Sequence, residues 1–143
     1  MFQNTTHTQS VDAPADAVWS LVAAGDRMDR YLGMIDTCTL DGEGAGAGRR
    51  CGTAMGDLVE RIETVDDETR TFQYSIFELP LPISRVFGTV RVRETGPETS
   101  EVTWSSNYEV AEADAAAMDE MVAGSYAEMT SNYERYAQEG TAA

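Results

Sequence analysis

The sequence predicts a single α+β domain in which a curved antiparallel sheet of about seven strands wraps around one long C-terminal helix. Three observations support this fold class. The 143 residues suit one domain. Short runs with strand-like alternation fill the middle of the chain, and a long amphipathic helical pattern comes only at its end. Residues 1–143 are therefore expected to form one domain with a real core.

The first strand is predicted over Thr5–Val11, where β-branched and polar residues are frequent. Two short helices are expected after it. Pro14 suits the first turn of a helix, and the apolar residues of Val18–Val22 give that helix a buried side. Gly25 interrupts the pattern, and Arg27–Leu32 forms the second short helix.

Six more strands follow, separated by turns rich in glycine, aspartate and proline. Their predicted ranges are Ile35–Leu40, Arg49–Met55, Leu58–Val65, Thr69–Glu78, Ser84–Arg93 and Ser100–Val110. Apolar and polar residues alternate strictly in the last strand, which predicts one buried and one exposed face.

The long helix is predicted over about Asp114–Gln138. Met118, Val122 and Met129 recur at three- and four-residue spacing and form part of one apolar stripe, while acidic residues cover most of the remainder. Such a helix would pack on the concave side of the sheet. A sheet bent around a helix encloses space, and whether that space is filled or hollow decides the function.

The charge of the chain excludes several function classes. The chain has 25 acidic residues and 10 basic ones, all of which are arginines, and its net charge is -15. Without lysine, Schiff-base chemistry and the phosphate-binding lysine of nucleotide sites are ruled out. The negative charge disfavours binding to nucleic acids or to anionic membranes. No apolar run reaches membrane-spanning length and the N-terminus lacks a secretory pattern, so a cytoplasmic location without membrane insertion is expected.

Cys38 and Cys51 would face each other if Leu40 and Arg49 flank the glycine-rich hairpin loop in register. Two free thiols in a reducing cytosol are nevertheless the expectation. His7 is the only histidine, which gives a weak case for a metal site, and no metal or other cofactor is predicted.

Two charged residues, Arg61 and Glu78, each lie an even number of positions from bulky apolar residues of the same predicted strand. Alternate residues of a strand point to the same face. If those apolar residues face the interior, a guanidinium and a carboxylate lie inside with them, where charges must pair or serve a ligand. The pair could then act as a catalytic site, with Arg61 stabilising negative charge and Glu78 moving a proton. Two alternatives stay open, namely a solvated strand edge and a structural ion pair without chemistry.

Three segments resemble a known family. They are Val11–Trp19, the glycine hairpin Gly44–Arg50, and the central strands from Glu60 to Ile83. The chain is similar in these segments to the START/Bet v 1-like (SRPBCC) superfamily, specifically its polyketide cyclase/dehydrase and lipid-transport group. The resemblance covers nearly the whole chain and implies a helix-grip fold. The Arg61 and Glu78 arrangement is also similar to that of the plant lachrymatory-factor synthases, although the segment Pro80-Leu81-Pro82 departs from them.

The resemblance implies a cavity that binds a small, mainly apolar ligand of lipid or polyketide type, in a monomer or a homodimer. Whether the ligand is turned over, by a cyclase/dehydrase or an isomerase without a cofactor, is left undecided. The alternative is a non-catalytic interaction protein with a filled core, such as a co-chaperone or a toxin–antitoxin component. The candidate ligand contacts, each of which could also be core filler, are Tyr74, Trp104, Tyr108, Met118, Val122 and Met129.

Overall fold

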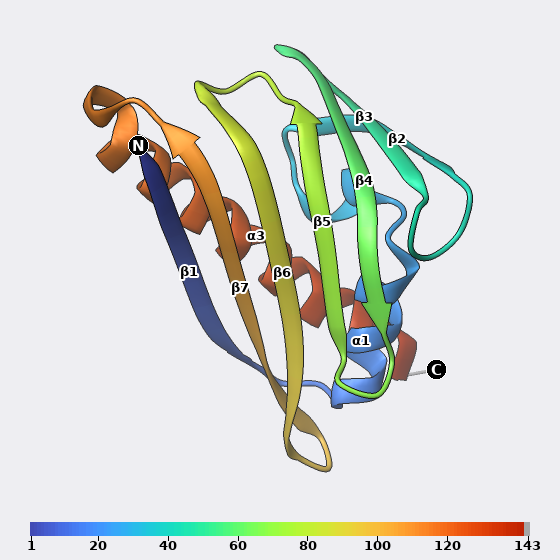
Figure 1. Cartoon of the computed structure of the whole chain (residues 1–143). Helices are drawn as coiled ribbons and strands as arrows, with labels where there is room; N and C mark the ends of the chain where they lie inside the picture. Colours follow the sequence, from blue (N-terminus) through green and yellow to red (C-terminus); the bar gives the residue numbers. More distant parts are fainter. Residues whose placement is uncertain (142–143) are drawn as a thin grey trace.

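The computed structural model describes residues 1–141 and confirms the predicted fold class. Seven strands form one antiparallel sheet in the order β1-β7-β6-β5-β4-β3-β2 (Figure 1). The strands are β1 (Phe2–Val11), β2 (Ile35–Asp41), β3 (Gly48–Thr53), β4 (Gly56–Asp66), β5 (Thr71–Glu78), β6 (Ile83–Gly96) and β7 (Thr99–Val110).

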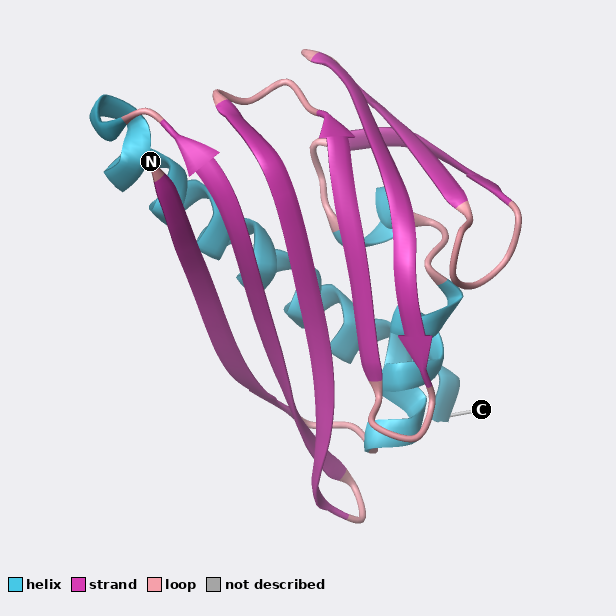
Figure 2. Cartoon of the chain, in the orientation of Figure 1, coloured by secondary structure: helices cyan, strands magenta, loops and turns pink. Residues whose placement is uncertain are grey.

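The helices lie on one side of the bent sheet (Figure 2). Two short helices, α1 (Ala15–Ala24) and α2 (Met28–Tyr31), connect β1 to β2 as predicted. The 3-10 helix η1 (Glu112–Asp114) leads into the long helix α3 (Ala115–Thr141), which runs across the sheet and packs on β1, α1 and α2. No helix within residues 1–141 has the length and apolar character needed to cross a membrane.

The predicted alternation in the last strand is confirmed. Val102, Trp104, Ser106, Tyr108 and Val110 of β7 are all buried, and the residues between them are more exposed. Successive side chains of a strand point to opposite faces of the sheet, so one face of β7 supplies a full row of side chains to the interior. The first strand begins at Phe2, earlier than predicted, because it pairs with β7 from that residue onward.

A β-bulge interrupts the alternation in β4. Ile62 pairs with Tyr74 and Thr64 pairs with Gln73, so Glu63 has no partner of its own in β5. An extra residue of this kind reverses which face the following side chains occupy. Two residues of β4 that are an even number of positions apart therefore lie on opposite faces of the sheet when one precedes Glu63 and the other follows it.

A second bulge lies near the end of β5. Glu60 pairs with Ile76 and Val59 pairs with Glu78, so Phe77 is the extra residue here. Ile76 is on the inner face with Glu60, whereas Glu78 joins Val59 on the outer face. These two bulges decide which charged groups enter the interior.

The hairpin of β2 and β3 has the predicted register, in which Leu40 lies opposite Arg49 and Cys38 opposite Cys51. The expectation of free thiols is wrong, because Cys38 and Cys51 form a disulfide across the two strands. Direct cross-strand pairing brings the two sulfur atoms together, and Cys51 is fully buried.

Candidate functional site

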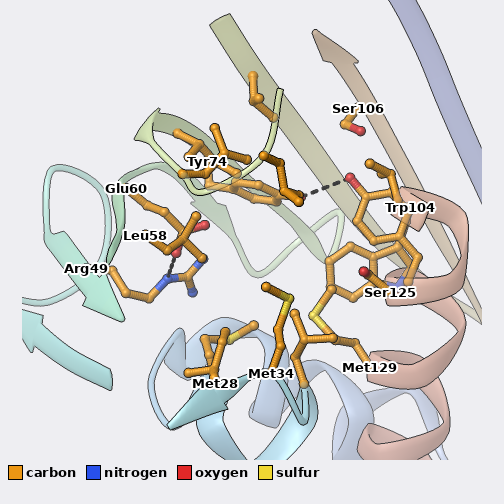
Figure 3. A pocket seen from close by; sticks show the side chains of 18 of the residues that line it. Met28, Met34, Arg49, Leu58, Glu60, Tyr74, Trp104, Ser106, Ser125 and Met129 are labelled. Atoms are coloured by element: carbon orange, nitrogen blue, oxygen red, sulfur yellow. Dashed lines mark hydrogen bonds and ion pairs between the residues drawn. The ribbon is translucent and has the colours of Figure 1, made fainter. Parts of the chain in front are cut away.

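A cavity of about 120 Å³ lies between the concave face of the sheet and the helices. Its walls are mostly apolar, and the side chains come from α1, α2, α3, most of the strands and the β5–β6 loop. Three methionines, Met28, Met34 and Met129, gather on the helical side of the cavity (Figure 3). The space predicted from the bent sheet is thus present, although it is small.

One end of the cavity holds a buried ion pair. Arg49 of β3 and Glu60 of β4 are register partners and therefore point to the same face. Arg49 Nε donates to Glu60 Oε2 at 2.5 Å, and the two side chains are only 3% and 4% exposed. Figure 3 shows the pair side by side at the edge of the cavity.

Two further contacts fix the Arg49 guanidinium. Its Nη1 donates to the carbonyl oxygen of Gly25 at 2.9 Å. Gly25 ends α1 in the left-handed conformation at φ 68°, and a Cβ on it would lie 2.9 Å from the Cδ1 atom of Ile62. Any other residue at this position would be strained by the positive φ and would push the end of the Ile62 side chain aside, so the position favours glycine. The guanidinium also lies over the rings of Phe72 and Tyr74, at 5.7 and 5.9 Å from their centroids.

The pair consists of one positive and one negative group, so its net charge is zero. Burial alone would lower the pKa of Arg49, but the charge and the hydrogen bond of Glu60 outweigh it, so that the pKa is raised. Within the described residues, neither Arg49 Nη2 nor Glu60 Oε1 has a hydrogen-bond partner. One donor nitrogen and one acceptor oxygen are therefore left over at a residue pair that lines the cavity.

The other end of the cavity is a cluster of hydroxyl groups. The hydroxyls of Tyr74 and Tyr126 are 3.2 Å apart and hydrogen-bonded (Figure 3). Burial raises the pKa of both tyrosines, so both stay protonated near neutral pH. Tyr74 can reach this place because it packs on Gly88, where a Cβ would lie only 2.2 Å from the Cζ atom of Tyr74.

Ser106 completes this cluster. It is fully buried, and its Oγ has no hydrogen-bond partner among the residues that the structure describes. The Ser106 hydroxyl is near enough to that of Tyr126 to lower the Tyr126 pKa against the larger effect of burial.

The structure brings five of the six predicted ligand contacts to the cavity, which are Tyr74, Trp104, Tyr108, Val122 and Met129. Met118 is the exception. It lies buried in a separate apolar cluster with Tyr108 and Val110 and does not line the cavity. The stripe of α3 is longer than the cavity, so its N-terminal end packs on the sheet instead.

The predicted inward placement of Arg61 and Glu78 is wrong. The side chain of Arg61 is 53% exposed, and its Nε donates to Glu63 Oε1 at 2.6 Å on the outer face. Glu78 is exposed as well and does not line the cavity. Val65 suggested that Arg61 faces inward, but the bulge at Glu63 separates the two residues. The bulge at Phe77 likewise separates Glu78 from the inner row of β5.

Sequence reasoning missed Arg49 and Glu60 as the interior charges. The spacing in the sequence could have indicated them. Arg49 is two positions from the buried Cys51, and Glu60 is two positions from the buried Ile62, so each points to the same face as its apolar neighbour. The short turn after Thr53 then pairs Arg49 with Glu60. Within residues 1–141, no group of three or more histidine, cysteine, aspartate or glutamate side chains is placed to hold a metal ion.

Comparison with known sequences gives a matching family and a partial match to a plant receptor. Residues 3–138 match the family described as polyketide cyclase / dehydrase and lipid transport. Over 75 residues, or 48% of the chain, the sequence is 33% identical to the abscisic acid receptor PYL2 of Arabidopsis thaliana. That match spans 40% of the length of the receptor.

Solved structures give the same architecture. The protein XoxI of Bacillus cereus has a TM-score of 0.81 at 25% identity, covering 92% of this chain and 93% of that one. Norcoclaurine synthase of Thalictrum flavum, solved with dopamine and hydroxybenzaldehyde, has a TM-score of 0.80 at 20% identity and coverages of 97% and 88%. The Zhui aromatase/cyclase of Streptomyces sp. R1128 has a TM-score of 0.81 at 16% identity and coverages of 96% and 94%. The last two likenesses show the fold alone.

Proposed function

The chain belongs to the polyketide cyclase/dehydrase and lipid transport family, and from this premise we propose that it binds a small, mainly apolar ligand in the cavity between the sheet and α3. The family includes proteins that act on such molecules and proteins that carry them. Membership of the family does not distinguish an enzyme from a carrier, so the proposal rests on the side chains that line the cavity of this chain.

The buried pair of Arg49 and Glu60 is the observation that carries the proposal. Removing two charges from water costs several kcal/mol per ion, and mutual attraction offsets this only in part. An apolar pair of similar volume would stabilise a filled core equally well or better. The pair instead keeps a free donor and a free acceptor beside a cavity. A polar group on an otherwise apolar ligand would use both.

The cavity limits the size of that ligand. A volume of about 120 Å³ is well below the roughly 300 Å³ of the smallest pockets for drug-sized molecules. It is closer to the engineered cavities of about 150 Å³ that bind benzene. The cavity in this shape therefore suits one ring or a short chain. A longer molecule would need Met34 and Met129 to change rotamer, which their unbranched side chains permit.

A cofactor-free cyclisation, dehydration or isomerisation is the second candidate function. It is favoured by the free Glu60 Oε1 beside the Arg49 guanidinium. Glu60 would accept a proton from a carbon next to a carbonyl group, and Arg49 would stabilise the negative oxygen that forms. In this version Arg49 and Glu60 take the roles that the sequence suggested for Arg61 and Glu78. The cytoplasmic location and the oligomeric state stay predictions.

Ligand binding can be tested by filling the cavity from α3. Val122 lines the cavity, whereas its neighbour Met121 is exposed and does not. Toluene is added to the isotope-labelled protein and the amide resonances are followed by NMR. We expect saturable shifts around the cavity in the wild type and in Met121→Trp, and none in Val122→Trp.

Native mass spectrometry of the freshly purified protein complements this test by looking for a bound small molecule. A folded wild-type protein that shows no saturable shift with toluene would contradict the proposal. That result would favour the interaction protein with a filled core.

A further inference from the structure

The two edges of the sheet are built differently. Strand β2 at one edge is short, has a bulge between Ile35 and Thr37 and carries Asp36 and Asp41. Bulges and charges of this kind keep an edge strand from pairing with another chain. Strand β1 at the other edge pairs with β7 without a bulge over Phe2–Val11 and contains no proline, aspartate, glutamate or arginine. Among residues 1–141, Figure 1 shows no further strand beside it. The β1 edge therefore lacks the protection of the β2 edge.

Alternate residues of β1 leave their backbone groups unpaired. The Met1 amino group donates to the Val110 carbonyl oxygen at 2.9 Å, and the Val110 N–H donates to the Met1 carbonyl oxygen at 2.8 Å. Such doubly bonded pairs alternate along an antiparallel ladder, and the β1–β7 register is unbroken, so the odd-numbered residues of β1 are bonded to β7. The even-numbered residues direct their N–H and C=O groups away from the sheet, and they are Phe2, Asn4, Thr6, Thr8 and Ser10.

We propose that β1 is a homodimer interface, in which it pairs antiparallel with β1 of a second copy about a two-fold axis at Thr6. The inference does not depend on the proposed function. In this register Thr6 lies opposite Thr6 of the second copy, Asn4 opposite Thr8, and Phe2 opposite Ser10. Each outward N–H of one strand then meets an outward carbonyl oxygen of the other. A shift of the register in either direction leaves some of these groups unpaired.

The charge of the chain favours this edge for contact between two copies. Each copy has a net charge of -15, so most surfaces of two copies repel each other. Strand β1 carries no acidic side chain that would oppose its own pairing. Its outward residues are exposed, and a threonine opposite a threonine forms a favourable cross-strand pair at the centre of the interface. Phe2, which is 63% exposed in one copy, gains a neighbour in the other.

Helix α3 leaves room for the second copy. It runs along β1, since Thr5 Oγ1 donates to Asp119 Oδ1 at 2.6 Å and Gln9 Nε2 donates to Ser131 Oγ at 3.1 Å. Between these two contacts, beside the middle of β1, short residues occupy exposed or half-buried positions of α3, namely Ala123, Gly124 and Ala127. A glycine inside a helix is destabilising, and no atom lies within 4 Å of a Cβ built on this one. Short side chains allow the α3 helices of two copies to approach closely across the two-fold axis.

The mass and the amide exchange of the full chain test the proposal. Sedimentation equilibrium should show the mass of two chains as the concentration is raised to about 1 mM. Amide hydrogen exchange followed by NMR then reports on the strand itself. In a single copy only the odd-numbered amides of β1 are hydrogen-bonded. In the dimer the amides of Asn4, Thr6 and Thr8 should be protected as well.

Thr6→Pro is the variant that should break the interface. Proline has no N–H, so the hydrogen bond that Thr6 donates across the axis is lost from both copies. In a single copy that N–H points away from β7, and an edge strand tolerates proline at such a position. We expect a folded monomer whose dissociation constant for the dimer is raised by about five- to 150-fold.

Charge exchange at Thr6 tests the axis directly, and it stays informative if Thr6→Pro does not fold. Thr6→Glu and Thr6→Lys each place like charges opposite one another, whereas an equal mixture of the two pairs opposite charges. The mixture should therefore dimerise more strongly than either variant alone. The matched control is Thr39, an exposed threonine of the other edge strand β2. Mixing Thr39→Glu with Thr39→Lys should give no such gain.

Two results would overturn the proposal. One is a wild-type chain that stays monomeric up to about 1 mM. The other is a dimer whose dissociation constant is unchanged in Thr6→Pro and which gains nothing when the two Thr6 charge variants are mixed, because another surface then joins the copies. Neither result bears on ligand binding in the cavity, which the toluene titration tests separately.

Discussion

The two faces of the sheet carry the same kind of ion pair in opposite surroundings. On the inner face, Arg49 and Glu60 are almost completely buried beside a cavity. On the outer face, Arg61 and Glu63 are joined by a similarly short contact, but the arginine is largely in water. Glu60 and Arg61 are neighbours in the sequence. The face of the sheet to which a side chain points, and not its residue type, therefore separates the candidate site from an ordinary surface pair.

The largest difference between the two faces should appear when one partner of each pair is removed. Arg49→Met leaves the Glu60 carboxylate buried and unpaired, which should lower the free energy of unfolding by about 3–5 kcal/mol. Arg61→Met on the outer face should leave the stability nearly unchanged, because water solvates Glu63. Chemical denaturation of both variants measures this.

Adding Glu60→Leu to Arg49→Met should recover most of the lost stability, because the unpaired charge is gone. Equal effects of Arg49→Met and Arg61→Met would mean that Arg49 is not held in a buried, desolvated pair.

A smaller effect should follow from crowding the inner face at Gly88. In Gly88→Ala the new Cβ meets the ring of Tyr74, which must move, and overpacking of this kind costs about 1–3 kcal/mol. Gly48→Ala is the matched strand control, since a Cβ there meets nothing within 4 Å. Thermal unfolding should separate the two variants. If Gly88→Ala is as stable as Gly48→Ala, Tyr74 is not held against the sheet as described.

The smallest effect is a pH dependence confined to alkaline solution. Tyrosine in the unfolded chain ionises near pH 10, whereas burial raises the pKa of Tyr74 in the folded protein. Above about pH 10 the unfolded state therefore binds fewer protons, and the free energy of unfolding falls by up to about 1.4 kcal/mol per pH unit for each such tyrosine. Below that pH the term is absent. Tyr74→Phe should show a shallower decline in urea denaturation measured between about pH 9 and 11. An identical slope in the wild type and the variant would mean that Tyr74 also ionises in the folded protein.

Most of the fold could be predicted because its signals are local. The alternation in Ser100–Val110, the stripe of α3 and the turn residues each depend on a few neighbouring positions. The register of the β2–β3 hairpin was predictable for the same reason, since Leu40 and Arg49 flank a loop of eight residues, four of which are glycines. The disulfide was not, because the redox environment decides it as much as the geometry does.

The candidate site was harder to predict because it depends on two bulges. Counting by twos from Val65 places Arg61 inside, and counting from Ile76 places Glu78 inside. Both counts pass over an extra residue that becomes visible only when the strands are paired. The aromatic residues Tyr74, Trp104 and Tyr108 were assigned correctly to the cavity wall, since no bulge lies between them and the apolar rows that placed them.

The bulge at Glu63 also affects how this chain is aligned with its homologues. Deleting that one residue would make Ile62 and Thr64 consecutive residues of a regular strand with their present partners, Tyr74 and Gln73, so that Glu60 would stay inside and Arg61 outside. A homologue that keeps a residue there but pairs it in a regular ladder would turn over the preceding part of its strand, and it would present the opposite charge to its ligand with both residues in the same alignment columns. Transfer of roles between members of the family should therefore follow strand pairing and gap placement, and not column identity alone.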